Sequence, residues 1–251
     1  RTMIKLAILG FGSRGQMFSR LIALDKDAQL VAVAEPVAEN MEKAKQKFEL
    51  DDSMCFSSAE EFFKAGKICD AIIICTQDNQ HYLHTLAALN LGYDICLEKP
   101  AAISIEQCIE IRDLANKLNR KVMLTHVLRY APFYQIMKQK IDSGELGKIV
   151  TINQTENIAF WHFALSYVRG PWSNMDESTP TILAKCSHDL DIINWLMSKK
   201  CIAVSSFGDL AYYNIKNAPK GSSHYCIDCS ADVREKCLYD AFKIDNKFIF
   251  C

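Results

Sequence analysis

The feature that most constrains the fold is the glycine motif GFGSRG at residues 10–15. It follows a short apolar run, residues 3–10, which predicts a buried strand, and apolar residues at helical spacing come after it. In this pattern the first glycine permits a tight turn, the second lets the backbone approach a pyrophosphate, and the third lets helix and strand pack closely. The sequence therefore predicts a dinucleotide site at a helix N-terminus, formed by Gly10, Phe11, Gly12, Ser13, Arg14 and Gly15.

Glu35 supports this interpretation, because it lies twenty residues after Gly15 at the end of a second apolar run. An acid at this spacing accepts hydrogen bonds from the adenosine ribose of NAD and repels the 2′-phosphate of NADP. Arg14 has the opposite tendency, since a guanidinium group can hold an additional phosphate. The sequence favours NAD and does not exclude NADP.

The first 126 residues alternate predicted strands with predicted helices. Ser58 and Ser104 each precede a residue at capping-box spacing, and Gly92 is typical of a helix C-cap. Strands that alternate with helices imply right-handed crossovers and a parallel sheet covered by helices on both faces. Beyond the first two strands, strands are expected at residues 71–76, 94–100 and 121–126, and helices at 38–48, at 81–91 and from 104 to about 118.

Two further loops follow predicted strands at their carboxyl ends, where ligands bind in sheets of this kind. The segment CTQDNQH offers Thr76, Asn79 and His81 to the cofactor cleft. The segment EKP offers Glu98 and Lys99, and the proline after the lysine fixes the turn. A lysine in this position is either a surface charge or a functional ammonium group, and its place in the pattern favours function.

The alternation of strands and helices stops at about Tyr130, and a second domain is predicted over residues 127–251. A helix is expected to run to residue 141, followed by a turn at DSGELG and a longer strand at residues 148–157. These elements predict a second α/β domain with a more antiparallel sheet.

Six segments together resemble the Gfo/Idh/MocA family, named for glucose–fructose oxidoreductase, inositol dehydrogenase and a rhizopine-catabolism protein. They are the glycine loop, CTQDNQH, EKP, RYAP at residues 129–132, SGELGKI at residues 143–149 and HDLD at residues 188–191. The resemblance implies an N-terminal Rossmann domain and a C-terminal α/β domain with an open, largely antiparallel sheet. It also implies oxidation of a secondary hydroxyl of a sugar or cyclitol, or reduction of the ketone, with NAD(P).

Two departures from the family pattern stand out. The usual aspartate four residues before the histidine is Ala184, and Lys185, one position further on, is a candidate replacement. Family members are also longer, so we expect the C-terminal sheet to need sequence beyond residue 251.

His188 is the predicted proton-transfer residue, with a satisfied structural histidine as the alternative. Asp191 lies three residues on, where it can accept a hydrogen bond that fixes the imidazole tautomer, while Leu190, Ile193 and Met197 form a separate apolar face. A histidine titrates near neutrality, which suits removal of a hydroxyl proton. The resemblance implies that His188 takes this proton and that Lys99 stabilises the developing alkoxide or shares the proton. Lys185 is the third catalytic candidate.

The stretch ENIAFWHFALSYVRGPW, residues 156–172, is rich in side chains that bind sugars. Aromatic faces stack on sugar rings, and polar groups bind hydroxyls. The alternative is a loop that packs its aromatic side chains against the second domain, and the sequence leaves both open. Trp161, His162, Arg169 and Trp172, together with Asp191, are the predicted substrate residues.

Eleven cysteines occur in a chain that is neither short nor led by a secretion signal. We therefore expect reduced thiols and a cytoplasmic location. Cys226, Cys229 and Cys237 are spaced C-x₂-C-x₇-C, and a closed zinc site would need a fourth ligand, for which His224 and Cys251 are candidates. Because no second C-x₂-C pair exists in the sequence, three reduced thiols are the favoured interpretation and no metal is expected.

The bulk properties exclude other classes of partner. A formal net charge of −1 without long runs of one sign argues against nucleic acid, and no apolar run approaches the roughly 20 residues that cross a membrane. We expect a small sugar or cyclitol substrate and, from the resemblance, a homo-oligomer, either a dimer or a tetramer. Alternatives are NAD-dependent, redox-assisted glycoside cleavage and a non-catalytic NAD-sensing regulatory subunit.

Overall fold

The computed structural model describes residues 3–170, 172–175 and 178–248. The chain divides into two compact units, Arg1–Leu128 and Arg129–Cys251. The division lies two residues beyond the boundary after residue 126 that the sequence predicts.

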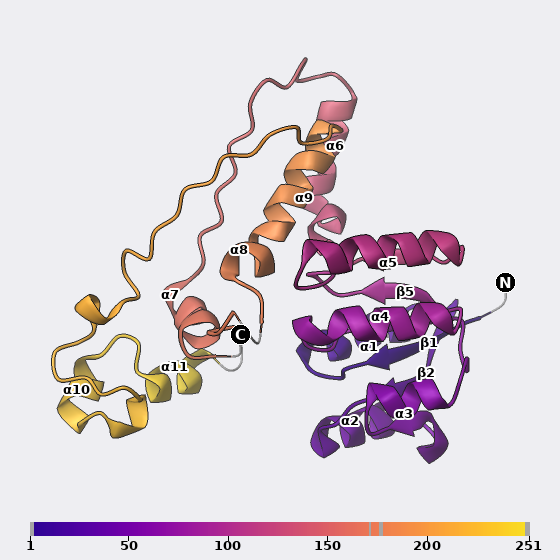
Figure 1. Ribbon diagram of the computed structural model, residues 1–251, viewed down its shortest axis with the longest axis horizontal. Helices are drawn as coiled ribbons and strands as arrows, with labels where there is room; N and C mark the ends of the chain where they lie inside the picture. The colour runs from indigo at the N-terminus through magenta and orange to yellow at the C-terminus, as the bar shows by residue number, and fades with distance from the viewer. Residues whose placement is uncertain (1–2, 171, 176–177, 249–251) are drawn as a thin grey trace. The chain divides into compact units, whose positions relative to one another are not determined.

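The first unit is a six-stranded parallel sheet with helices packed on it (Figure 1). The strand order is β3-β2-β1-β4-β5-β6. Because this order reverses between β1 and β4, a ligand crevice is expected at the carboxyl ends of these two strands. The strands are β1 Ile4–Leu9, β2 Ala28–Ala34, β3 Cys55–Phe56, β4 Ala71–Ile74, β5 Asp94–Leu97 and β6 Val122–Leu124, and the helices are α1 Ser13–Leu24, α2 Ala38–Phe48, α3 Ala59–Lys64, α4 His81–Asn90 and α5 Ile105–Lys117.

Apolar cores lie on both faces of the sheet, because successive side chains of a strand point to opposite faces. On one face Leu9 packs in a cluster with Phe62 of α3 and Leu89 of α4. On the other face Ile8 packs in a cluster with Ile22 of α1. Burying one such side chain stabilises the fold by about 1.5–3 kcal/mol, so these clusters hold the helices against the sheet.

The predicted helix boundaries in this unit are confirmed by their caps. The Ser58 hydroxyl accepts a hydrogen bond from the Glu61 backbone N–H at 3.2 Å, and Ser104 accepts one from Gln107 at 3.3 Å. Gly92 follows α4 with a φ of +80°, a conformation that favours glycine. The sequence did not predict β3, because two residues are too few to show a strand periodicity.

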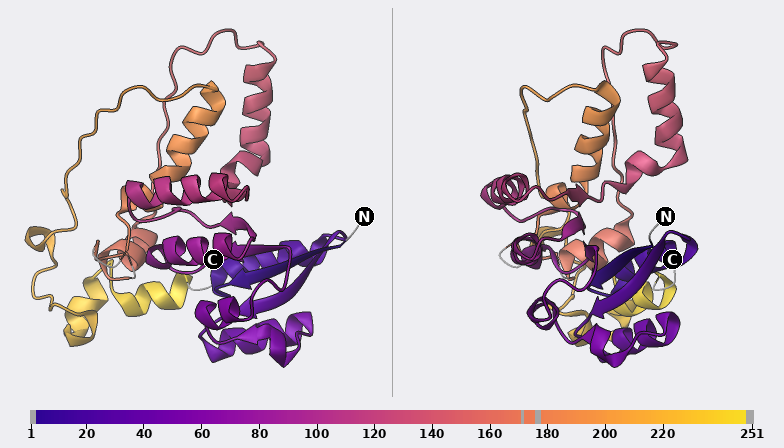
Figure 2. Two further views of the ribbon diagram at one scale, coloured as in Figure 1. Left: turned by 45° about the vertical axis from the view of Figure 1, so that its right-hand side comes forward. Right: turned by 90° about the vertical axis from the view of Figure 1, so that its right-hand side faces the viewer.

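The described residues of the second unit form helices joined by longer irregular segments, and α6 and α9 lie side by side (Figure 2). None of the described helices of the chain has both the length and the apolar character of a membrane span. The elements of this unit are α6 Pro132–Asp142, α7 Phe160–Phe163, a π-helical segment Ala164–Val168, α8 Thr181–Ala184, α9 Cys186–Met197, α10 Ala231–Lys236 and α11 Ala241–Phe248.

The strand predicted at residues 148–157 is not formed, and the described part of the second unit contains no strand. A strand needs a neighbour that pairs its backbone N–H and C=O groups. No described segment pairs with residues 148–157, so this segment does not form a strand of a sheet. The antiparallel sheet of the second unit stays a prediction.

Replacing Gly15 with alanine should destabilise the first unit, whereas Gly12→Ala should not. A Cβ atom on Gly15 would lie 2.1 Å from the carbonyl oxygen of Gly10, while nothing lies within 4 Å of a Cβ atom on Gly12. Forcing an atom into a filled space costs about 1–3 kcal/mol, so we expect a loss of that size for Gly15→Ala. We expect a change below about 1 kcal/mol for Gly12→Ala. Urea unfolding followed by circular dichroism measures both, and equal stabilities for the two variants would contradict this packing.

Candidate functional site

The glycine loop lies at the carboxyl end of β1, beside the end of β4. Gly10 has a φ of +86°, and a Cβ atom there would lie 2.7 Å from the carbonyl oxygen of Cys75. Gly12 is the N-cap residue of α1, and no side chain caps the free N–H groups of the first turn. The positive end of a helix dipole next to open space above Gly12 is suited to a phosphate group. The loop therefore fits the pyrophosphate of a dinucleotide.

Glu35 braces this loop from the end of β2. Its side chain is buried, and its carboxylate accepts hydrogen bonds from the Phe11 backbone N–H at 2.5 Å and the Val37 backbone N–H at 2.9 Å. Each carboxylate oxygen can accept more than one hydrogen bond, so the predicted ribose contact is compatible with this bracing. The Phe11 side chain is buried in the core, so only its backbone is available to a cofactor.

Arg14 is held by Glu98 at the end of β5. The Arg14 Nε and Nη2 atoms lie 2.7 and 2.5 Å from Glu98 Oε1, and Glu98 is buried. Glu98 Oε2 also accepts a hydrogen bond from the Lys99 backbone N–H at 3.1 Å. The carboxylate thus compensates the charge of Arg14 and ties the glycine loop to the lysine loop.

His81 connects the loops that follow β4 and β5, and its side chain is 1% exposed. Its ring nitrogens lie 2.7 Å from the Pro100 carbonyl oxygen and 3.1 Å from the Thr76 carbonyl oxygen. The sequence predicts a cofactor contact for His81, but the structure gives the imidazole two backbone partners instead. Thr76 Oγ1 likewise lies 3.0 Å from His84 Nδ1.

Lys99 and Asn79 are accessible predicted site residues of these two loops. The Lys99 side chain is half-buried, and Asn79 is exposed. Nearby Cys75 and Cys96 are half-buried thiols, and burial raises the pKa of both, that of Cys96 to about 11. These thiols are therefore protonated at neutral pH and pack as small apolar groups.

The second unit carries His188 and Lys185 where α8 meets α9. Lys185 lies between the two helices, and the His188 backbone N–H donates to the Lys185 carbonyl oxygen at 3.0 Å. Burial lowers the pKa of Lys185, and the charge of Glu156 opposes this shift. Burial also lowers the pKa of His162, with a smaller contribution from the Lys185 charge. Lys185 and His162 therefore belong to one electrostatic environment.

The Asp191 carboxylate forms a two-point ion pair with Arg129 of the RYAP segment. The hydrogen bond from His188 to Asp191 stays a prediction. The Arg129 Nε and Nη2 atoms lie 2.7 and 2.6 Å from the two Asp191 oxygens. The pair holds the start of this unit against α9. The buried side of α9 also differs from the prediction.

On α9 the buried residues are Asp189, Ile192 and Leu196, whereas Leu190 is 56% exposed. The sequence predicts Leu190, Ile193 and Met197 on the buried side, and this prediction is wrong for Leu190. A helix face is set by what packs against it, and hydrophobic spacing alone does not identify that neighbour.

The aromatic stretch packs largely against aromatic residues. Trp161 and His162 meet edge to face at 5.5 Å between ring centroids, and Trp172 lies 6.2 Å from Tyr167. Arg169 is different, because its Nη1 atom donates to the Tyr239 carbonyl oxygen at 2.6 Å and the residue lines a cavity. Both interpretations of this stretch therefore keep some support.

Cys226, Cys229 and Cys237 line one cavity of about 270 Å³ together with His224. Among the described residues, no three potential ligands converge closely enough to hold a metal ion. Cys251, the other candidate ligand, lies outside the described residues.

Two ion pairs and one tyrosine cluster were not predicted from the sequence. Arg14–Glu98 and Arg129–Asp191 join residues 84 and 62 positions apart, for which a single sequence carries no signal. The repeated aromatic residues of AYYN, at 211–214, were the available signal for the cluster of Tyr212, Tyr213 and Tyr239.

The chain is similar to cyclitol dehydrogenases. It is 30% identical over 149 residues to the inositol 2-dehydrogenase/D-chiro-inositol 3-dehydrogenase of Lactiplantibacillus plantarum, an alignment that covers 59% of this chain and 39% of that protein. It is 27% identical over 197 residues to an inositol 2-dehydrogenase of Klebsiella pneumoniae, covering 78% and 55%. The crystal structure of scyllo-inositol dehydrogenase from Lactobacillus casei with NAD(H) and scyllo-inositol matches with a TM-score of 0.67 and 25% identity, covering 79% and 57%.

In each of these comparisons the chain spans less than two thirds of the relative's own length. The model of the Gfo/Idh/MocA family, described as oxidoreductases with an NAD-binding Rossmann fold, matches residues 4–126. This range coincides with the parallel sheet and its glycine loop. Residues 4–126 therefore belong to the Gfo/Idh/MocA family of oxidoreductases and form its NAD-binding Rossmann domain.

Proposed function

We propose that this protein is an NAD(P)-dependent oxidoreductase that transfers hydride between nicotinamide and a secondary hydroxyl or ketone of a sugar or cyclitol. The observation that carries the proposal is the open, uncapped N-terminus of α1 at Gly12, placed where the strand order reverses. The inositol dehydrogenases to which the chain is similar support a cyclitol or sugar as the substrate class. An antiparallel sheet in the second unit, self-association and a cytoplasmic location are part of the same proposal.

The charges around the loop favour NAD over NADP. Glu35 places a carboxylate at the end of β2, where it repels a 2′-phosphate. Arg14, the cation of the loop, is already compensated by Glu98. The phosphate-binding capacity that the sequence suggests for Arg14 is therefore reduced.

In the proposed reaction one side chain takes the proton and another stabilises the developing charge. A third is an alternative proton acceptor. Bound NAD would accept the hydride from the carbon that bears the hydroxyl. His188 takes the hydroxyl proton on a ring nitrogen, and the Lys99 ammonium stabilises the negative charge that develops on the oxygen. Lys185 is the second candidate acceptor, because burial of its amine favours the neutral form.

Gly12→Ala should weaken NAD binding although it leaves the fold intact. A methyl group at this position occupies the open space above the start of α1, where the pyrophosphate must approach the backbone. We expect NAD affinity to fall by at least about tenfold, which corresponds to about 1.4 kcal/mol. Isothermal titration calorimetry with NAD measures this change, and unaltered affinity in the folded variant would count against the proposed site.

Alanine substitutions separate an enzyme from an NAD sensor. Lys99→Ala and His188→Ala should each lower turnover by about 10²- to 10⁴-fold, because each removes a group that handles the proton or the developing charge. NAD affinity should change little, because the glycine loop is untouched. The matched control is Lys117→Ala at an exposed position of α5. Turnover is followed as nicotinamide absorbance over a panel of inositols, sugars and their keto forms, and unchanged turnover in both variants would refute the assigned roles.

The pH dependence distinguishes Lys185 from His188 as the proton acceptor. Because burial lowers the pKa of Lys185, the neutral amine forms below the ordinary lysine pKa of 10.5. If Lys185 is the acceptor, kcat/KM rises as the pH increases through its lowered pKa. Lys185→Arg, which stays protonated, then removes this rise. An unchanged pH profile in Lys185→Arg would assign the proton to His188.

A further inference from the structure

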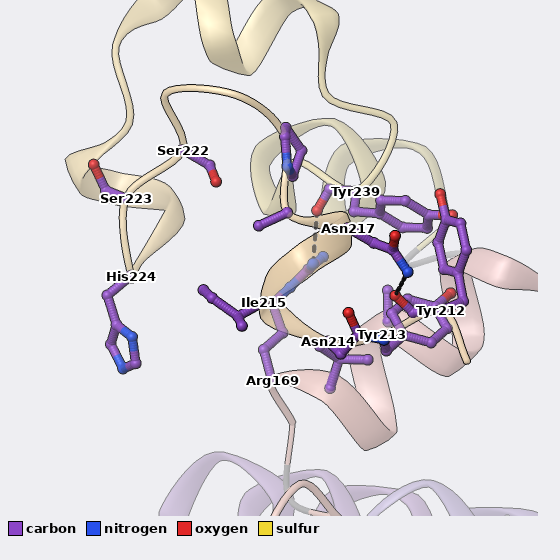
Figure 3. Close-up of a pocket in the computed structure, with 14 residues that line it drawn as sticks. Arg169, Tyr212, Tyr213, Asn214, Ile215, Asn217, Ser222, Ser223, His224 and Tyr239 are labelled. Atoms are coloured by element: carbon purple, nitrogen blue, oxygen red, sulfur yellow. Dashed lines mark hydrogen bonds between the residues drawn. The ribbon is translucent and has the colours of Figure 1, made fainter. Parts of the chain in front are cut away.

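The second unit contains a cavity of about 600 Å³ that the proposed reaction does not use (Figure 3). It is lined by residues of three segments, namely 164–169, 212–224 and Tyr239. Of the predicted substrate residues, Arg169 alone lines it. The volume lies within the range of about 300–1,000 Å³ that is typical of small-molecule sites. The cavity therefore has the size of a ligand site.

Arg169 is the charged centre of this cavity. Its Nη1 atom donates to the Tyr239 carbonyl oxygen at 2.6 Å, as Figure 3 shows, while its Nη2 atom is buried without a hydrogen-bond partner among the described residues. No aspartate or glutamate is among the described residues that line the cavity. Asp240 lies in the lining of an adjoining cavity of about 270 Å³ that Arg169 also lines, and its Oδ1 atom lies 3.5 Å from Arg234 Nε. A buried guanidinium donor without a partner is unfavourable, and an anionic ligand would satisfy it.

The backbone holds Arg169 in place. The residue follows the π-helical segment Ala164–Val168, and its N–H donates to the Ala164 carbonyl oxygen at 3.2 Å. A Cβ atom on Gly170 would lie 2.0 Å from the Leu165 carbonyl oxygen, so this turn accepts only glycine there. Short π-helical segments occur frequently at functional sites.

Three tyrosines form the aromatic wall of the cavity. The rings of Tyr212, Tyr213 and Tyr239 lie 5.3–6.0 Å apart, and Tyr213 stacks on Phe163 at 4.9 Å with an interplanar angle of 14°. A hydrogen bond with Tyr212, and then burial, raises the pKa of Tyr239, so its hydroxyl stays neutral. Such a wall offers aromatic faces and neutral hydroxyl groups to a ring that bears hydroxyls.

We propose that this cavity binds a monosaccharide that carries one anionic group, a phosphate or a carboxylate. The anion lies on Arg169, and the sugar ring lies against the tyrosines. Binding of this ligand class is independent of the hydride transfer.

Calorimetric titration of the full chain without NAD tests the proposal. The probes are glucose 6-phosphate, glucuronate and uncharged glucose, so that the first two distinguish phosphate from carboxylate. At least one anionic sugar should bind about 10-fold or more tightly than glucose, because only the anion forms a charge-assisted hydrogen bond with Arg169. Arg169→Met should remove this preference. Lys216→Met, which removes an exposed cation of the same segment that does not line the cavity, should keep it.

A second variant covers the case in which Arg169→Met fails to fold, as judged by near-ultraviolet circular dichroism. Ala218→Phe places a ring in the cavity and leaves the bond between Arg169 and Tyr239 in place, so it should abolish binding of the anionic sugar. Equal binding of charged and uncharged sugars to the unmodified chain, or full binding by Ala218→Phe, would overturn the proposal.

Discussion

The close approach of Gly15 to the carbonyl oxygen of Gly10 is the contact on which the first unit depends. It brings the start of α1 against the end of β1, and Gly10 in turn packs against the backbone after β4. Any side chain at Gly10 or Gly15 would separate these elements. The open, positively polarised helix end at Gly12 is a direct consequence of this packing.

Buried carboxylates connect the other loops to this contact. Glu35 receives the Phe11 N–H of the glycine loop, and Glu98 receives both the Arg14 guanidinium group and the Lys99 N–H. His81 adds a link between the turns after β4 and β5. The cofactor-facing loops are therefore positioned by the protein itself, which reduces the ordering that a ligand must induce.

Local signals were sufficient to predict most of the first unit. The glycine motif, the serine caps and the apolar runs specify its strands and helices, because each signal lies within a few residues of the structure it determines. Long-range pairs such as Arg129–Asp191, and the burial of His81 between two carbonyl oxygens, depend on the assembled fold and leave no local pattern. The prediction of a strand at residues 148–157 was wrong for the same reason, because a strand forms only where another segment pairs with its backbone.

Amide hydrogen exchange with and without NAD is the most direct test of the dinucleotide site. If the glycine loop and the strand ends hold the cofactor, NAD should slow exchange at residues 12–16 and in the loops at 76–80 and 98–99. The outer strand β3 should be unaffected, because it lies at the sheet edge away from the reversal of strand order. Bound NAD that leaves exchange at residues 12–16 unchanged and protects other segments would contradict this location.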